Sequence, residues 1–270
     1  MTLGRGLQHL GRLLLCALLT VTASTHGSDE DSKAGQGPKP ASPTRVLFVG
    51  NSYLYYNDSL HNHVKRMVEE LRPDIADHLK YKSATIGGAR LSHHNIDWLL
   101  TPGQIGVAEP FELVVMQGGS AEVLSDDARS RFYATASTYA DKVRESGAEP
   151  MLYMTHAYVP PHRRARPGMI DEVAAAYLEA GKQAEARVVP VGLSFDESYR
   201  RRPEFNLHMS FDGTHPNIRG TYLAACTVYL SLYGGSLEAL SYDYFGELPP
   251  EEAAYLRSVA TAVVDDFAGH

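Results

Sequence analysis

The run Arg45-Val-Leu-Phe-Val-Gly50-Asn-Ser52 decides the fold class of this 270-residue chain. Its four apolar residues follow one another without polar alternation, which is typical of a strand buried on both faces of a parallel sheet. Gly50 ends the run, and Asn51 and Ser52 come directly after it. Ligands of α/β proteins bind beyond the carboxyl ends of such strands. The run therefore predicts a parallel sheet, with Ser52 where a ligand would bind.

The rest of the chain repeats this strand, with helices between the copies. Further strands are predicted at residues 79–86, 111–116, 150–154 and 187–191. Apolar residues at helical spacing predict helices over residues 60–71, 126–146, 169–186 and 217–233. Parallel strands need long, mostly right-handed crossovers. The alternation therefore predicts an α/β fold, a three-layer α/β/α sandwich with a five-stranded parallel sheet.

Glycine-rich or polar residues follow the predicted strands. Gly87 and Gly88 come after the second strand, Gln117 begins a polar turn after the third, and His156 follows the fourth. The carboxyl ends of parallel strands lie along one edge of a sheet, so these residues and Ser52 should meet in one cleft. We expect His156 to contact the substrate there.

A second motif, Asp212-Gly-Thr-His215-Pro216, precedes the last of these predicted helices. With Ser52 it brings together a carboxylate, an imidazole and a hydroxyl. A serine hydroxyl becomes a useful nucleophile when a base takes its proton and a third group orients that base. Two structural alternatives stay open at this point. Asp212 could only cap the turn, and Ser52 could only cap a short helix.

Together these residues resemble the SGNH hydrolases, also called GDSL-type esterases and lipases, which have a flavodoxin-like α/β/α fold. Gly50-Asn51-Ser52 is similar to the first family block, Gly-Asp-Ser, which holds the nucleophile. Gly88 resembles the glycine of the second block, whose N–H helps to form the oxyanion hole. Asp212 and His215 match the last block, Asp-x-x-His-Pro. The resemblance implies a serine esterase with Ser52 as nucleophile, His215 as base and Asp212 as orienting acid.

The chain departs from the family pattern in two places. Asn51 replaces the usual aspartate beside the nucleophile. The family usually has Gly-x-Asn-Asp in its third block, where the asparagine donates to the oxyanion, whereas this chain has Gln117-Gly-Gly-Ser120. Gln117 carries the same amide on a longer arm. We therefore expect Gln117 to complete an oxyanion hole with the N–H groups of Ser52 and Gly88.

The first 43 residues predict export. Arg5 and Arg12 precede an apolar run of about ten residues, and Val21-Thr-Ala23 has the small-residue pattern of a signal-peptidase site. This run is shorter than the roughly 18 residues that span a bilayer, so no stable membrane anchor is expected. Residues 24–43, rich in Ser, Gly, Pro and charge, predict a disordered linker. We expect a signal peptide at 1–23, a linker at 24–43, a hydrolase domain at 44–270 and a secreted or periplasmic protein.

Charge and composition narrow the choice of partners. A net charge of −7 and the lack of a long basic run argue against nucleic acid. His61 and His63 lie two apart on a predicted helix and do not share a face, and the serine mechanism needs neither metal nor cofactor. We expect this protein to be a carbohydrate or short-chain acyl esterase, whose substrate is a small-molecule or glycan ester. The alternatives are a non-catalytic carbohydrate-binding protein with a degenerate SGNH site, and a metal-dependent hydrolase.

Overall fold

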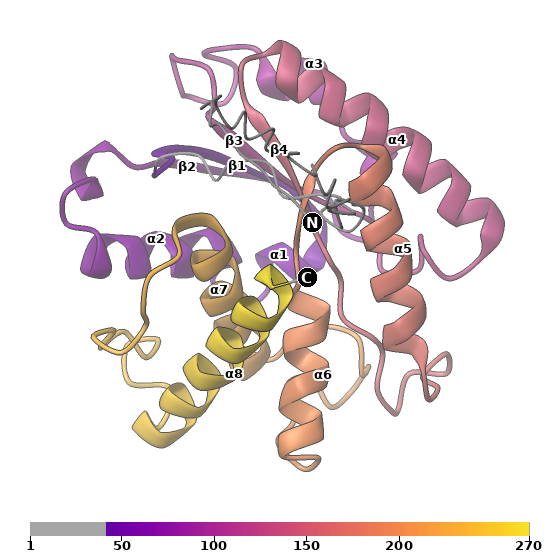
Figure 1. The fold of residues 1–270 in the computed structure, drawn as a ribbon, viewed down its shortest axis with the longest axis vertical. Helices are drawn as coiled ribbons and strands as arrows, with labels where there is room; N and C mark the ends of the chain where they lie inside the picture. Colours follow the sequence, from indigo (N-terminus) through magenta and orange to yellow (C-terminus); the bar gives the residue numbers. More distant parts are fainter. Residues whose placement is uncertain (1–41, 270) are drawn as a thin grey trace, which may run out of the picture. The chain divides into compact units, whose positions relative to one another are not determined.

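The computed structural model describes residues 42–269. Within them, five strands form one parallel sheet (Figure 1). The strand order is β2-β1-β3-β4-β5. The strands are β1 Arg45–Gly50, β2 Lys80–Thr85, β3 Leu113–Gln117, β4 Glu149–Tyr153 and β5 Arg187–Val189. The predicted sheet is confirmed. The predicted signal peptide, and the predicted linker up to residue 41, lie outside the described residues.

Helices connect the strands and cover both faces of the sheet. They are α1 Ser52–Tyr55, α2 Leu60–Leu71, α3 Ile96–Leu100, α4 Asp126–Glu145, α5 Met169–Gln183, α6 Val191–Arg201, α7 Ile218–Tyr233 and α8 Pro250–Ala268, with short 3₁₀ turns η1 Ala76–His78 and η2 Leu91–His93. All four predicted helices are present. Within residues 42–269, no helix has the length and apolar content needed to cross a membrane.

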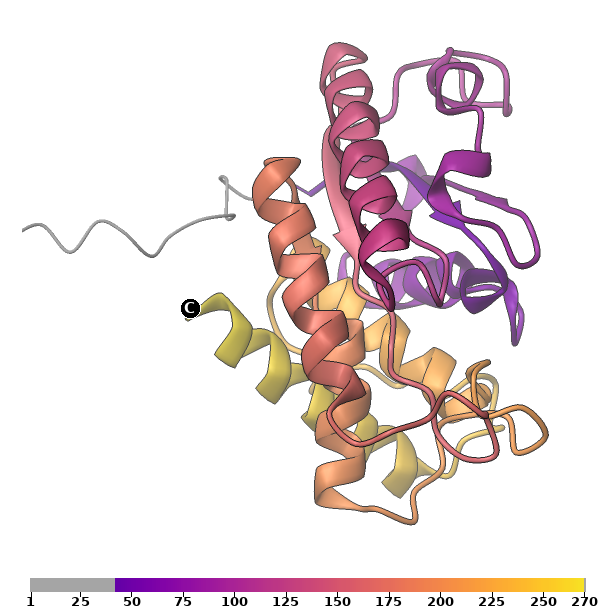
Figure 2. The same cartoon turned by 90° about the vertical axis from the view of Figure 1, so that its right-hand side faces the viewer.

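The side chains of β1 alternate between two apolar cores. Val46 and Phe48 pack in the core formed with α2, α6, α7 and α8, whereas Leu47 and Val49 pack in the core formed with α3, α4 and α5. All four are fully buried, and each such burial stabilises the fold by about 1.5–3 kcal/mol. Figure 2 shows α4 and α5 side by side on one face of the sheet. The three predicted layers are therefore present.

Two long helices, α6 and α8, were not predicted, and α7 begins differently from the expectation. Helix α7 begins at Ile218, one residue after the predicted start at 217, and Asn217 caps it by accepting the N–H of Gly220. Pro216, just before the cap, pairs with His208 in an isolated antiparallel bridge. The residues before α7 therefore form a closed loop, and this loop carries His215.

Candidate active site

Ser52, His215 and Asp212 form one hydrogen-bonded line. His215 Nδ1 lies 2.6 Å from Asp212 Oδ2, and His215 Nε2 lies 2.8 Å from Ser52 Oγ. An ionised carboxylate can only accept, so the Nδ1 nitrogen carries the proton. The Nε2 nitrogen is then free to accept the proton of the Ser52 hydroxyl. This is the arrangement in which a histidine activates a serine.

The loop that carries His215 is held at both ends. The N–H of Met209 donates to the His215 carbonyl at 2.8 Å, and the N–H of Asn217 donates to the Leu207 carbonyl at 2.9 Å. Gly213 lies inside this loop with φ +64°, and a Cβ built there would come within 2.0 Å of the Val159 carbonyl oxygen. A side chain at this position would clash as well as strain the backbone. The glycine of the second motif is therefore a packing requirement.

Asp212 is fixed as well as charged. Its Oδ1 accepts the N–H groups of Thr214, at 2.9 Å, and His215, at 3.1 Å, which leaves Oδ2 for the imidazole. Burial acts to raise the pKa of Asp212, but the N–H of Thr214 and the hydrogen bonds from His215 together hold that pKa below its ordinary value. Asp212 is therefore ionised at neutral pH and orients the imidazole.

Ser52 is placed by the turn between β1 and α1. Asn51 is the N-cap of α1, and its side-chain oxygen accepts the N–H of Tyr53 at 3.1 Å. Ser52 is the first residue of the helix, where a backbone N–H has no acceptor within the helix. The alternative that Ser52 only caps a short helix is therefore wrong, because the cap is Asn51.

Gln117 does not fit the expected role of oxyanion donor. Its Oε1 accepts the N–H of Asn51 at 3.2 Å, which fixes the orientation of the amide. Its Nε2 donates to Asn51 Oδ1 at 3.0 Å and to the carbonyl of Gly118 at 2.7 Å, so both amide hydrogens have acceptors. The side chain is buried. Gln117 therefore braces β1 against β3 and does not face the cleft.

A separate hydrogen bond requires the amide of Asn51, at the position where the SGNH first block has aspartate. Asn51 Nδ2 donates to the carbonyl of Ala89 at 3.1 Å, and a carboxylate has no hydrogen to give. Ala89 directly follows Gly88, so the bond ties the turn that holds Ser52 to the loop after β2. Gly88 has φ +68°, and a Cβ built on it would meet nothing within 4 Å. Its backbone therefore borders open space, as an oxyanion donor requires.

His156 lies close to the triad but not in the cleft. Its ring is stacked between Tyr53 and Phe195, each at 4.3 Å between ring centroids, and only 1% of the residue is exposed. His156 Nδ1 lies 3.0 Å from His208 Nε2. Burial, with a smaller contribution from His208, lowers the pKa of His156 well below its ordinary value. The expected substrate contact is therefore wrong, because aromatic rings cover the imidazole on both faces.

Comparisons with known proteins identify the fold. Neither family models nor curated protein sequences match the chain. A DUF4886 family protein from Bacteroides uniformis is 16% identical, with a TM-score of 0.62 over 81% of this chain and 93% of that one. A protein from Slackia heliotrinireducens described as an SGNH hydrolase is 19% identical, with a TM-score of 0.54 over 69% and 97%. A mutant acetylxylan esterase from Geobacillus stearothermophilus is 13% identical, with a TM-score of 0.57 over 73% and 97%.

The chain has the SGNH hydrolase fold. Within this fold, the loop after β3 contains Gly119 and Glu122 at the spacing of the family block Gly-x-Asn-Asp, which puts Ala121 at the asparagine position. Glu122 is buried, and its Oε2 accepts the N–H of Gly119 at 2.5 Å and the N–H of Leu91 at 3.2 Å. This carboxylate therefore joins the loops after β2 and β3. The spacing between Gly119 and Glu122 is the signal that could have identified it from the sequence.

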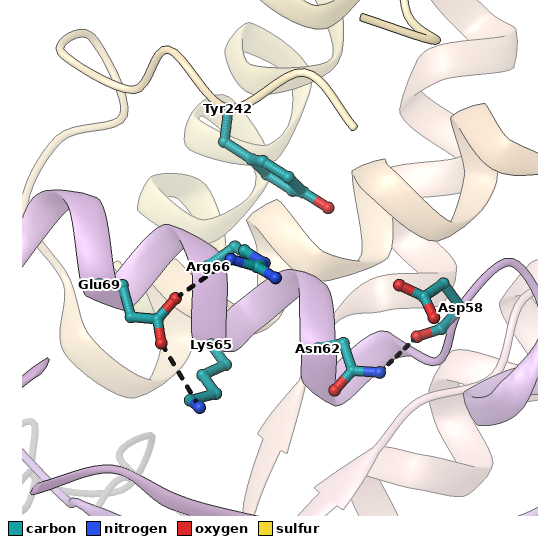
Figure 3. Close-up of a pocket in the computed structure, with 6 residues that line it drawn as sticks. All are labelled: Asp58, Asn62, Lys65, Arg66, Glu69 and Tyr242. Carbon is teal, nitrogen blue, oxygen red and sulfur yellow. Dashed lines mark hydrogen bonds and ion pairs between the residues drawn. The ribbon is translucent and has the colours of Figure 1, made fainter. Parts of the chain in front are cut away.

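A surface pocket of about 250 Å³ lies elsewhere on this SGNH hydrolase fold (Figure 3). Its lining consists of Asp58, Asn62, Lys65, Arg66, Glu69 and Tyr242. Glu69 pairs with both cations, at 3.4 Å to Lys65 Nζ and 3.8 Å to an Arg66 guanidinium nitrogen. The pocket contains no triad residue. Within residues 42–269, no group of three or more His, Cys, Asp or Glu side chains is arranged to hold a metal ion.

Proposed function

We propose that this protein is a serine hydrolase that cleaves ester bonds through an acyl-enzyme. The observation that carries the proposal is the line from Asp212 through His215 to Ser52, with hydrogen bonds of 2.6 and 2.8 Å. The comparisons support a hydrolase, because proteins with this fold include acetylxylan esterases. A triad with intact geometry favours catalysis over a degenerate, sugar-binding site.

In the proposed reaction, Ser52 Oγ attacks the ester carbonyl while its proton passes to His215 Nε2. The carbonyl π electrons move onto oxygen, and Asp212 stabilises the imidazolium that forms. Collapse of the tetrahedral intermediate expels the alcohol, which takes the proton from His215. Water, deprotonated by the same imidazole, then releases the acid and restores Ser52.

The oxyanion would be bound mainly by backbone N–H groups. The N–H of Ser52 lies in the turn after β1, and the N–H of Gly88 lies in the loop after β2. The hydrogen bond from Asn51 to the Ala89 carbonyl ties these two segments together. The N–H of Gly119 is less suitable, since Glu122 already accepts it. Donors fixed before the reaction need no reorganisation in the transition state.

Ser120 is the side chain best suited to replace the missing asparagine. It is partly exposed and adjoins Gly119, where a Cβ would come within 3.2 Å of the Ala89 carbonyl oxygen. Burial raises the pKa of Tyr53 and of Tyr158, and a hydrogen bond of Ser120 with each hydroxyl opposes that rise. Ser120 therefore lies beside Tyr53, which is in the helix that begins at Ser52. We propose that its hydroxyl accepts from the two tyrosines and gives its own hydrogen to the oxyanion as the third donor.

An acylated carbohydrate or another short-chain ester is the substrate class that we favour. Two exposed apolar side chains stand next to site residues in the chain, Phe211 before Asp212 and Ile86 before the loop of Gly88. Apolar contacts beside a polar reaction centre suit a ligand with both hydroxyl-bearing and apolar faces. We also propose that residues 1–23 direct export and that the mature protein starts near Ser24, which mass spectrometry of the secreted protein would check.

The test is an ester panel run on the wild-type protein and on Ser52→Ala. The panel contains acetylated xylo-oligosaccharides and aryl esters of short and long acids. We expect hydrolysis of acetyl esters by the wild type and its loss in the folded variant. Hydrolysis that persists in Ser52→Ala would refute the mechanism. A wild-type protein that binds the sugars but cleaves none of these esters would favour the carbohydrate-binding alternative.

A further inference from the structure

The imidazole of His215 is contacted by aromatic rings as well as by its two hydrogen-bond partners. Tyr56 stacks flat against it, with ring centroids 4.3 Å apart and an angle of 11° between the planes. Tyr53 approaches from another direction in an edge contact, at 5.9 Å and 84°. Tyr55 stacks in turn on Tyr56, at 5.7 Å and 27°. The base is therefore held on a face as well as at both nitrogens.

Tyr56 is held in this position by an unusual segment of backbone. Its N–H donates to the carbonyl of Ser52 at 3.1 Å, so it caps the helix of the nucleophile. The next three residues, Asn57, Asp58 and Ser59, have φ of 51°, 67° and 66°. Residues other than glycine rarely adopt this left-handed conformation, because it brings the Cβ close to the backbone and costs free energy. The surrounding contacts must offset this cost.

Asn57 supplies those contacts and connects them to the histidine loop. Its Nδ2 donates to the carbonyl of Pro216 at 2.9 Å and to Thr221 Oγ1 at 2.7 Å. Its own carbonyl oxygen lies 2.6 Å from His63 Nε2. The segment after α1 therefore ties the nucleophile helix to the residue that follows His215, and this tie keeps the Tyr56 ring on the imidazole.

We propose that Tyr56 is a positioning residue that acts through His215 by stabilising the imidazolium formed as Ser52 attacks. The inference rests on the proposed function. In the ground state the imidazole is neutral, and in the transition state it takes the Ser52 proton and becomes a cation. The electron-rich face of an aromatic ring attracts the imidazolium cation more strongly than it attracts the neutral imidazole. The contact therefore strengthens when the charge appears, which is the condition for lowering a barrier.

The ring face, not the phenol hydroxyl, carries this role. The titratable groups that face His215 are Asp212 on its own loop, Tyr53 in α1, Tyr56 at the C-cap of α1, and His156 after β4. Changing Tyr56 leaves the other three in place. An effect of Tyr56 on the pH profile would therefore report the ring contact.

The experiment compares four full-length proteins: wild type, Tyr56→Phe, Tyr56→Leu, and a protein with pentafluorophenylalanine at position 56, whose ring has the same shape but a reversed face charge. We expect Tyr56→Leu and the fluorinated protein to lower kcat about tenfold, within the range of a lost cation–π contact, with KM within about twofold. The acid limb of kcat/KM should move to lower pH in both. Tyr56→Phe should retain most of kcat.

Tyr244→Leu is the matched control, because Tyr244 stacks on His63, at 4.8 Å and 23°, in a tyrosine–histidine pair outside the triad. It should change kcat less than about twofold. Should Tyr56→Leu fail to fold, the fluorinated protein decides alone. An active wild type whose fluorinated variant keeps the same kcat and acid limb would overturn this inference alone. A wild type inactive on the whole ester panel and unreactive to fluorophosphonate would instead overturn the proposed function.

Discussion

Tyr53 contacts two histidine sites, His215 on its own and His156 with its partner His208, and their surroundings give the two sites opposite properties. The His215 side chain is 24% exposed, with a carboxylate on one nitrogen and a hydroxyl on the other. His156 is buried, and its partner is a second histidine, His208, which bonds in turn to Tyr199 at 2.7 Å. Burial lowers the pKa of His208 to about 4. These surroundings, a carboxylate on one nitrogen and partial exposure to solvent, are what suit His215 rather than His156 to the proposed role of base.

The largest effect that tests this comparison is the loss of His215. His215→Gln removes the proton acceptor and should lower kcat by about 10⁴–10⁶, as knockouts in other serine triads do. His208→Gln should lower kcat less than about tenfold, since glutamine can still bond to both neighbours and the reaction does not use this ring. Steady-state kinetics on an acetyl ester measures both. Equal losses in the two variants would remove the distinction between the two sites.

Asp212→Asn tests the carboxylate alone. Asparagine can keep Oδ1 as acceptor for the N–H groups of Thr214 and His215, so the free energy of unfolding should fall by no more than about 1–2 kcal/mol. Its amide would face Nδ1 with a donor, which favours the wrong imidazole tautomer. We expect kcat to fall about 10³–10⁴-fold. Urea unfolding and kinetics on the same samples separate the two effects, and a parallel loss of stability and activity would contradict the orienting role.

The third test separates two candidate donors after β3. Ser120→Ala should lower kcat about 10²–10³-fold with little change in KM or in melting temperature, as expected for one lost oxyanion donor. Gln117→Ala should act mainly on stability, by about 1–3 kcal/mol, because it leaves the N–H of Asn51 without its acceptor. The reverse pattern would return the donor role to Gln117.

The smallest expected effect is a loss of folding stability at acidic pH, caused by protonation of His208 in the unfolded chain. The pKa of His208 is about 4 in the folded protein and about 6.5 when unfolded, so between these values the unfolded chain binds more protons. The free energy of unfolding should therefore fall as the pH drops below 6.5, by at most about 1.4 kcal/mol per pH unit for this residue. Urea unfolding at pH 7, 6 and 5 should give a shallower slope for His208→Gln. An unchanged slope would show that His208 does not contribute.

Most of the fold could be predicted because local signals agree with it. Most of the predicted strands are apolar runs, and the helices between strands carry apolar residues at helical spacing. Helix α6 could not be predicted, because it contains Gly192, a weak helix former. A Cβ there would come within 2.3 Å of the Thr155 carbonyl oxygen, so the reason for glycine is a distant contact. Helix α8 carries a start signal, Pro250 followed by Glu251 and Glu252, that could have predicted it.

The candidate site also contains residues whose roles could be predicted from the sequence and residues whose roles could not. Short motifs predicted Ser52 and His215 as neighbours, because both the residue types and their spacing are constrained by chemistry. The expectations for Gln117 and His156 failed because position along a strand does not reveal what covers a side chain. The Gln117 amide is hydrogen-bonded to Asn51, and the His156 imidazole is stacked between two aromatic rings. Neither partner can be read from local sequence.

Labelling with a fluorophosphonate tests the central claim most directly, because the reagent forms a covalent bond only with an activated serine. Full-length wild type and His215→Gln would be treated, digested and mapped by mass spectrometry. We predict a single adduct on Ser52 in the wild type, formed far more slowly in His215→Gln. A folded wild-type protein that acquires no adduct, or acquires it on another serine or at a rate independent of His215, would contradict the proposed mechanism.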